Sequence, residues 1–172
     1  MNTISYRNAI VEDAFTIHRL AHAIWPEAYG SILSDGQIDY MLRTYYDPEA
    51  IRLQMEQQQY HFILQYVNGQ PVGFGTWSNE GNSTFKIQKL YILPQHQGSG
   101  LGKQLISYLL SVLTAQGAQK VFLNVNRYNK ARFFYEKLGF TITGEEDIPI
   151  GQNYFMEDYI MTWYPANSSS VT

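Results

Sequence analysis

The sequence contains no cysteine among its 172 residues. Disulfide bonds, cysteine-ligated metal centres and a cysteine nucleophile are therefore excluded from this chain, so no covalent thiol intermediate can form on it. Charged residues are also scarce, at 16% of the chain, and the formal net charge is -3 with no dense run of lysine and arginine. This charge pattern offers no broad basic surface, so nucleic acid is not an expected partner.

Long apolar runs are missing as well. Residues 1–7 show no basic stretch followed by an apolar one, and no later segment reaches the length needed to cross a bilayer. We therefore expect no membrane partner and a cytoplasmic protein. His18 and His22 lie one helical turn apart, but no glutamate stands between them and no third ligand stands out, so no metal is expected.

Hydrophobic residues make up 45% of the chain and aromatic residues 15%, which is typical of a folded protein with a substantial core. The length suits one domain, too small to hold separate cofactor and substrate domains. We expect this domain to cover residues 1–164. Residues 165–172 include three consecutive serines and show no apolar period, which predicts a disordered tail.

Hydrophobic periodicity predicts a helical first third, after a short strand, and then mainly strands. Asn68 and Gly69 supply the positive backbone angles of a tight hairpin turn. Helices are expected at residues 11–25, 34–45, 47–58, 101–113 and 130–138, and strands at residues 60–67, 70–78, 83–93, 120–125, 140–143 and 154–163.

The most informative segment is residues 90–103, which passes from a strand through glycines directly into a helix. Such a turn exposes unpaired backbone N–H groups at the helix N-terminus, where the helix dipole also favours negative charge. The segment is therefore expected to bind an anion, most naturally a phosphate. Glycines that merely permit the turn are the alternative.

The spacing of the glycines argues against two familiar phosphate loops. A P-loop needs four residues between its first glycine and the Gly-Lys pair, but Gly98 is too close to Gly102, and Gln104 stands where serine or threonine is required. A dinucleotide-binding turn needs its third glycine one position later and an acid about twenty residues on, where residues 121–123 are apolar.

The pattern Gln97-x-x-Gly100-x-Gly102, after a strand and Pro94, resembles the central motif of the GCN5-related N-acetyltransferase (GNAT) family. Residues 123–140 resemble the later strand and helix of that family, and the matches together span about half the chain. Residues 151–159 and the early helices are similar to the PaiA-like polyamine acetyltransferase branch. The resemblance implies an α/β (α+β) fold, with a mixed, mostly antiparallel sheet whose parallel central strands splay apart and with flanking helices.

The resemblance also implies that acetyl-coenzyme A is the co-substrate, held by the strand before the loop and by the loop itself. The implied contacts are Leu90, Tyr91, Ile92, Gln97, Gly98, Ser99, Gly100, Leu101, Gly102, Lys103, Asn129, Phe134, Tyr135 and Lys137. Asn129 lies one residue further from Ala131 than is usual in the family. Either Asn129 reaches the cofactor through an altered turn, or Asn126 takes its place.

In the family a tyrosine at the position of Tyr135 serves as general acid for the leaving thiolate, although a core aromatic is the alternative here. Many relatives carry a glutamate where this chain has Gln88, and an amide cannot act as a base. Gln88 therefore either positions a water or is a solvated strand residue, and Glu157 and Asp158 are the candidate substitutes for the base. The residues assigned to the amine substrate are Trp25, Tyr29, Gln88, Glu157 and Asp158. Trp25 and Tyr29 could equally be core aromatics.

The sequence therefore predicts transfer of acetyl from acetyl-coenzyme A to a primary amine by direct attack in a ternary complex. Polyamine, amino acid, peptide N-terminus, lysine and antibiotic remain open as acceptors, with polyamines favoured by the acidic pair Glu157 and Asp158. A non-catalytic acyl-coenzyme A sensor is the alternative, and Gln88 is the residue that favours it. A homodimer is common in the family.

Overall fold

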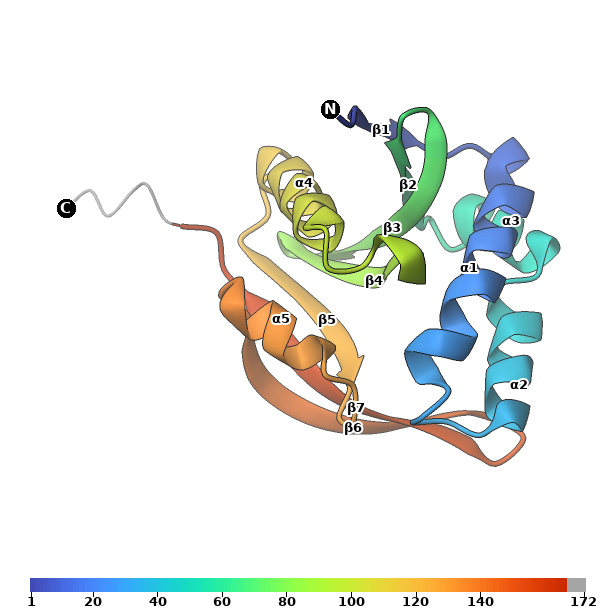
Figure 1. Ribbon diagram of the computed structural model, residues 1–172. Coiled ribbons are helices and arrows are strands. Elements are labelled where there is room, and N and C mark those ends of the chain that lie inside the picture. The colour runs from blue at the N-terminus through green and yellow to red at the C-terminus, as the bar shows by residue number, and fades with distance from the viewer. Residues whose placement is uncertain (167–172) are drawn as a thin grey trace. The chain divides into compact units, whose positions relative to one another are not determined.

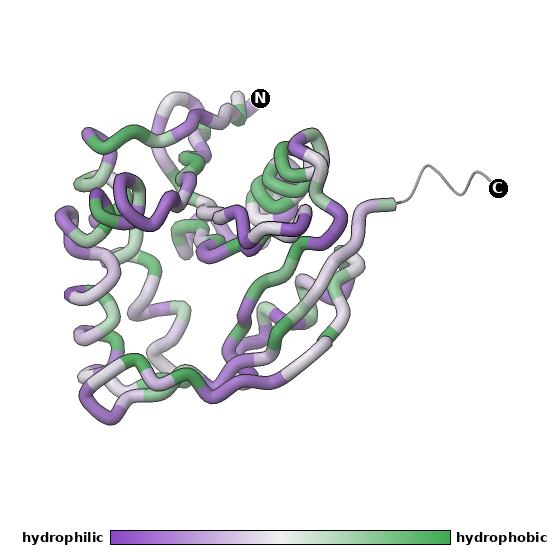
Figure 2. Tube along the Cα trace, turned by 180° about the vertical axis from the view of Figure 1, so that it is seen from behind, coloured by the Kyte–Doolittle hydropathy of each residue, from purple (hydrophilic) through white to green (hydrophobic). Residues whose placement is uncertain are grey.

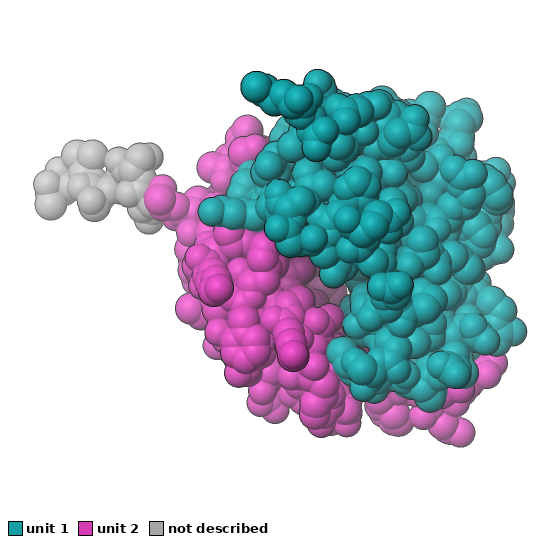
Figure 3. Space-filling model, in the orientation of Figure 1, with its two compact units in different colours: residues 1–78, 88–109 teal, residues 79–87, 110–172 magenta. Residues whose placement is uncertain are grey.

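The structure is a computed structural model, and it describes residues 1–166. Residues 167–172, which hold most of the expected tail, lie outside the described residues. Backbone contacts divide the chain into two compact units, one of residues 1–78 with 88–109 and one of residues 79–87 with 110–172 (Figure 3). A single domain over residues 1–164 stays a prediction.

The helices and strands follow the predicted order (Figure 1). The helices are α1 (Ala14–Tyr29), α2 (Asp35–Tyr45), α3 (Pro48–Glu56), α4 (Leu101–Ala115) and α5 (Ala131–Lys137), with short 3-10 turns η1 (Val11–Asp13) and η2 (Pro94–His96). The strands are β1 (Ile4–Asn8), β2 (His61–Val67), β3 (Gln70–Gly81), β4 (Thr84–Ile92), β5 (Lys120–Asn126), β6 (Thr141–Gly151) and β7 (Tyr154–Trp163).

The seven strands follow the order β1-β2-β3-β4-β5-β7-β6. β4 and β5 pair in parallel, whereas β1 with β2, β2 with β3, β5 with β7 and β6 with β7 pair antiparallel. The parallel register joins only residues 84–87 to residues 120–123, although both strands continue beyond it. The mixed, mostly antiparallel sheet with parallel central strands that part early is confirmed.

In the first unit, α1 packs against α2 and α3. Both later helices begin with a side-chain cap. The Ser34 hydroxyl accepts a hydrogen bond from the Gln37 N–H at 3.1 Å, and the Asp47 carboxylate accepts one from the Glu49 N–H at 3.1 Å. Each cap satisfies a backbone donor that the first turn of a helix leaves unpaired.

α1 is longer than the sequence predicts, because it runs through Pro26 to Tyr29. Proline removes one helical hydrogen bond, which disfavours this continuation of the helix. Burial outweighs that loss, since the Trp25 and Tyr29 side chains are 2% and 7% exposed, whereas Pro26 faces solvent. The apolar stripe predicted ahead of them is buried at Ala14, Ile17, Leu20, Ala21 and Ile24.

α4 buries an apolar stripe. Leu105, Leu109 and Leu113 are fully buried, and hydrophobic residues recur along the helix in Figure 2. Gly117, beyond the end of the helix, has a φ of +90°, the left-handed conformation expected of a helix cap. No helix among residues 1–166 is long and apolar enough to span a membrane.

In the second unit, β5 pairs with β7, and β7 with β6. β6 runs to Gly151, well beyond the four residues predicted for it. Three consecutive acids at residues 145–147 and Pro149 obscure the strand in the sequence, because these residues disfavour strands. They are tolerated here because β6 forms the edge of the sheet and most of its residues are exposed.

Candidate functional site

The glycine loop takes a conformation that only glycine adopts readily. Gly98 and Gly100 have φ angles of +79° and +82°, and no heavy atom lies within 4 Å of the position that a Cβ would take on either residue. The backbone angle, not crowding, therefore requires glycine at both positions. The open space beside the loop leaves its backbone accessible to a ligand.

α4 begins directly after this loop. The Gln104 N–H donates to the Gly100 carbonyl at 3.0 Å, which is the first bond of the helical ladder. The N–H groups of residues 101–103 precede that ladder and have no acceptor within the helix. Together with the helix dipole they favour an anion at the loop, and the exposed Lys103 side chain adds a positive charge.

Two side chains within the loop hold its shape. The exposed Gln97 donates from Nε2 to the Ile92 carbonyl at 3.4 Å, which ties the loop to the end of β4. The Ser99 hydroxyl donates to the His96 carbonyl. Of the residues assigned to the phosphate loop, these two therefore contribute to the turn itself.

Gln65 supports the first turn of α4, which follows the loop. No pattern in the sequence predicted this role. This fully buried side chain on β2 donates from Nε2 to the Leu101 carbonyl at 3.1 Å, in the first turn of α4, and to the Tyr6 hydroxyl at 3.3 Å. The contact joins residues 36 apart in sequence. Its one local signal in the sequence is a polar residue inside the strand, directly after the apolar run of residues 62–64.

The aromatic residues assigned to the amine lie beside Tyr91, which was assigned to the cofactor. The Tyr29 and Tyr91 hydroxyls are 3.0 Å apart, within hydrogen-bonding distance, and the Trp25 and Tyr29 ring centres are 4.3 Å apart. Tyr46 completes the cluster against Trp25 at 5.5 Å, and burial raises the pKa of its hydroxyl. The rings of Trp25, Tyr29 and Tyr46 are buried, and Tyr91 is partly buried on the strand expected to pair with the cofactor.

Gln88 lies on β4 and is partly buried. Its Nε2 donates to the Ser78 hydroxyl at 3.0 Å, which fixes the orientation of the amide. The amide oxygen keeps its capacity to accept a hydrogen bond. Water positioning by Gln88 stays a prediction.

In the second unit, Tyr135 lies on α5 and is 8% exposed. Its ring packs edge-to-face against Phe134 and Phe140, with ring centres 5.2 and 5.7 Å away. Such packing holds the phenol in one orientation, as a general acid requires, although a core aromatic would be held in the same way. Phe134 is partly buried and Lys137 is exposed on the same helix.

Both candidate asparagines act locally. The Asn129 side-chain oxygen accepts from the Ala131 N–H at 2.9 Å, at the start of α5. The Asn126 side-chain oxygen accepts from the Tyr128 N–H at 2.9 Å, and Asn126 is 4% exposed. Which of the two contacts the cofactor stays open.

The two acids on β7 have opposite environments. Glu157 is exposed, whereas Asp158 is 6% exposed. Burial raises the pKa of the Asp158 carboxyl, a shift partly offset by a hydrogen bond from Asn124 at 3.3 Å and by the charges of Lys86 and Arg127. The assignment of both acids to the amine stays a prediction.

No group of three metal-ligating side chains occurs within residues 1–166. The histidine pair on α1 makes local contacts instead. His18 Nδ1 lies 2.7 Å from the Tyr46 carbonyl oxygen, and His22 Nδ1 lies 2.9 Å from the His18 carbonyl oxygen.

A family model for the GNAT acetyltransferase domain matches residues 31–152, which include the glycine loop and α5. The chain belongs to the GNAT family. This GNAT chain is 33% identical to an N-acetyltransferase of Mycobacterium tuberculosis over 95 residues, which are 55% of this chain and 60% of that protein. It is 35% identical to the ribosomal protein bS18-alanine N-acetyltransferase of Haemophilus influenzae over 88 residues, 51% of this chain and 56% of that protein. The GNAT chain thus aligns with less than two thirds of the length of these curated relatives.

Solved structures resemble the GNAT chain over most of its length. The PaiA N-acetyltransferase of Thermoplasma acidophilum, solved in complex with coenzyme A, matches with a TM-score of 0.80 at 24% identity, over 94% of this chain and 99% of that one. The ribosomal-protein-S18-alanine N-acetyltransferase of Escherichia coli matches with a TM-score of 0.72 at 18% identity, over 100% of this chain and 99% of that one. At 24% and 18% identity, the structural likeness establishes the fold alone.

Proposed function

We propose that this protein transfers an acetyl group from acetyl-coenzyme A to a primary amine by direct attack in a ternary complex. The observation that carries the proposal is the loop at residues 97–103, where two glycines with positive φ precede the unpaired N–H groups of α4. These residues fit a pyrophosphate, because they offer backbone donors, a helix N-terminus and open space. Membership of the GNAT family supports the same co-substrate.

The chain's own groups have three tasks in this mechanism. Backbone N–H groups near Ile92 polarise the thioester carbonyl, and Gln88 orients a water that takes one proton from the ammonium of the acceptor, so that the neutral amine can attack. The amine nitrogen then forms a bond to the acetyl carbon, and as the carbon–sulfur bond breaks the nitrogen releases its second proton to solvent, which leaves a neutral amide. Tyr135 gives its hydroxyl proton to the departing sulfur and regains one from solvent.

For the acceptor we propose a polyamine ahead of a peptide amine. The acidic residues of β6 and β7 support a cationic small molecule, and the PaiA structure shares the fold. A peptide N-terminus is the alternative acceptor, because one relative is named as a ribosomal protein bS18-alanine N-acetyltransferase. A homodimer, common in the family, is part of the proposal.

A non-catalytic acyl-coenzyme A sensor is the second candidate function. Gln88 favours it, because the amide is held by Ser78 and cannot take a proton from the amine. A sensor would bind acetyl-coenzyme A and release no thiol with any amine.

Calorimetry with acetyl-coenzyme A, coenzyme A and NADH, followed by thiol release across a panel of amines, separates these functions. The transferase binds the two coenzyme A species but not NADH, and releases thiol only with an amine. Failure to bind acetyl-coenzyme A overturns both functions. Tyr135→Phe is expected to lower kcat about a hundredfold with unchanged cofactor affinity.

Gly100→Ala with Gly117→Ala as its matched control tests the loop itself. Both glycines have positive φ and open space around a Cβ, so each change should cost about 1–2 kcal/mol of backbone strain. Only Gly100→Ala should weaken acetyl-coenzyme A binding. Equal affinities for the two variants would contradict a phosphate-binding role for the loop.

A further inference from the structure

The hairpin of β6 and β7 places three polar side chains on one face of the second unit. In the strand registers, Asp158 lies opposite Asn126 of β5 on one side and opposite Glu146 of β6 on the other. Residues paired across strands point to the same face, so these three side chains are neighbours. Glu145 and Glu157 are adjacent in sequence to members of this set and point to the other face.

Asp158 is the exceptional member of the set. It is 6% exposed, and its Oδ2 accepts a hydrogen bond from Asn124 Nδ2 at 3.3 Å. Its Oδ1 is buried and accepts no hydrogen bond from the described residues. A buried carboxylate oxygen without a donor costs folding free energy, and such a cost is commonly retained at a site that binds a ligand.

The cations of this unit do not satisfy that oxygen. Arg127 forms its ion pair with Asp147 at 2.7 Å and contacts Asp158 only through the backbone carbonyl, at 3.4 Å. The Lys86 ammonium lies over the Phe122 ring, 5.7 Å from its centre. Neither forms an ion pair with the Asp158 carboxylate, and both act on it as more distant charges.

We propose that Asp158 binds the non-reacting ammonium group of a diamine or polyamine acceptor, with Oδ1 accepting an N–H of that group. Glu146, exposed and directly across the ladder, adds a second negative charge for a longer polyamine. This inference rests on the proposed transferase and assigns one residue to its proposed polyamine acceptor. An ammonium would supply the donor that Oδ1 lacks, and the neighbouring acids raise the local negative charge that favours it.

The test compares 1,4-diaminobutane with n-butylamine, which has the same chain length and one amine fewer. For the unaltered protein, the KM for the diamine should be about ten- to a hundredfold lower, the range expected of a hydrogen bond between charged groups. Asp158→Asn keeps an acceptor for Asn124 but removes the charge. It should remove this preference by raising the KM for the diamine much more than the KM for n-butylamine.

Glu145→Gln is the matched control, because it removes an acid from the same hairpin on the opposite face, across from Tyr159. It should keep the preference for the diamine. Glu146 is exposed, so Glu146→Gln should leave the fold intact, and it should reduce the preference for the diamine severalfold. This variant tests the ammonium site even if Asp158→Asn does not fold. Retention of the full preference in both Asp158→Asn and Glu146→Gln would overturn the proposal, and so would an equal fall in kcat for the two amines with Asp158→Asn.

Calorimetric binding of 1,4-diaminobutane in the presence of coenzyme A separates this inference from the proposed function. If the protein releases no thiol yet binds the diamine at least tenfold more tightly than Asp158→Asn does, the transferase fails and the ammonium site stands. If thiol is released but the two proteins bind the diamine equally, the ammonium site fails and the transferase stands.

Discussion

A Cβ atom on Gly73 would lie 2.6 Å from the backbone oxygen of Tyr91. β3 and β4 therefore approach each other closely at the stretch of β4 expected to pair with coenzyme A. Because the obstacle is backbone, Gly73→Ala must displace β4. We expect a loss of about 1–3 kcal/mol in the free energy of unfolding together with weaker coenzyme A binding, measured by chemical denaturation and calorimetry.

Gly75→Ala is the control for this change. A Cβ on Gly75 also meets an atom at 2.6 Å, but that atom is Cδ1 of Leu109, the end of a side chain that can rotate. Its effect on stability should be smaller and its effect on coenzyme A affinity negligible. If Gly73→Ala and Gly75→Ala lost equal affinity for coenzyme A, displacement of β4 by the Gly73 substitution would be excluded as the cause.

Gln65→Met tests whether the buried amide positions the first turn of α4. The variant loses the hydrogen bond to the Leu101 carbonyl, and we expect coenzyme A affinity to fall about fivefold, the equivalent of about 1 kcal/mol. Stability should change less, because Gln65 Oε1 is buried without a donor and its removal offsets the lost bond. Lower stability with unchanged coenzyme A affinity would make the role purely structural.

The glycine loop could be predicted from the sequence because its signal is local. The glycines, the preceding strand and the following apolar stripe occupy consecutive residues, and each has one physical meaning. The contact between Gln65 and Leu101 could not be predicted in this way. It depends on how β2 lies under α4, and no local pattern specifies that.

The two acids on β7 show the same limit. Glu157 and Asp158 are equivalent as sequence, and both were assigned to the amine. Alternation along the strand buries one and exposes the other, so the choice depends on the register of β5, β6 and β7. That register could not be predicted, because residues 145–147 and Pro149 disfavour a strand and most of β6 was therefore not predicted.

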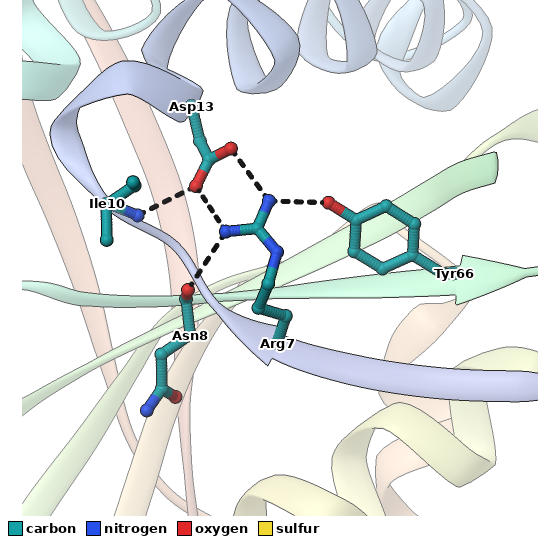
Figure 4. Close-up of polar contacts among 5 residues, drawn as sticks. All are labelled: Arg7, Asn8, Ile10, Asp13 and Tyr66. Carbon is teal, nitrogen blue, oxygen red and sulfur yellow. Dashed lines mark hydrogen bonds and ion pairs between the residues drawn. The ribbon is translucent and has the colours of Figure 1, made fainter. Parts of the chain in front are cut away.

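Asp13→Asn should destabilise the protein in a pH-dependent way. The Asp13 carboxylate accepts two hydrogen bonds from the Arg7 guanidinium, at 2.9 and 2.8 Å, and one from the Ile10 N–H at 2.8 Å (Figure 4). The hydrogen bonds from Arg7 are the main reason that the pKa of Asp13 is lowered. The stabilisation is therefore present above the ordinary pKa of an aspartate and is lost as the pH falls through the lower, folded-state value.

We expect Asp13→Asn to cost about 1–2 kcal/mol near pH 7, with a difference from the unaltered protein that narrows below about pH 4. Denaturant unfolding over a pH series measures this difference. Glu49→Gln is the control, since its ion pair with Arg52 is exposed and should contribute less than about 0.5 kcal/mol. A difference that stays constant with pH would exclude the charge of Asp13 as its cause.

Asp158→Asn should have the opposite effect on stability. Burial raises the pKa of Asp158 above its ordinary value, so ionising this carboxyl in the folded protein costs free energy. The protein loses stability as the pH rises from the ordinary pKa through the raised one, and the variant escapes that loss. We therefore expect a higher Tm for Asp158→Asn than for the unaltered protein at pH 7 and equal values in acid. A lower Tm at pH 7 would instead mean that the charged carboxylate stabilises the fold, which would remove the reason to assign it to a ligand.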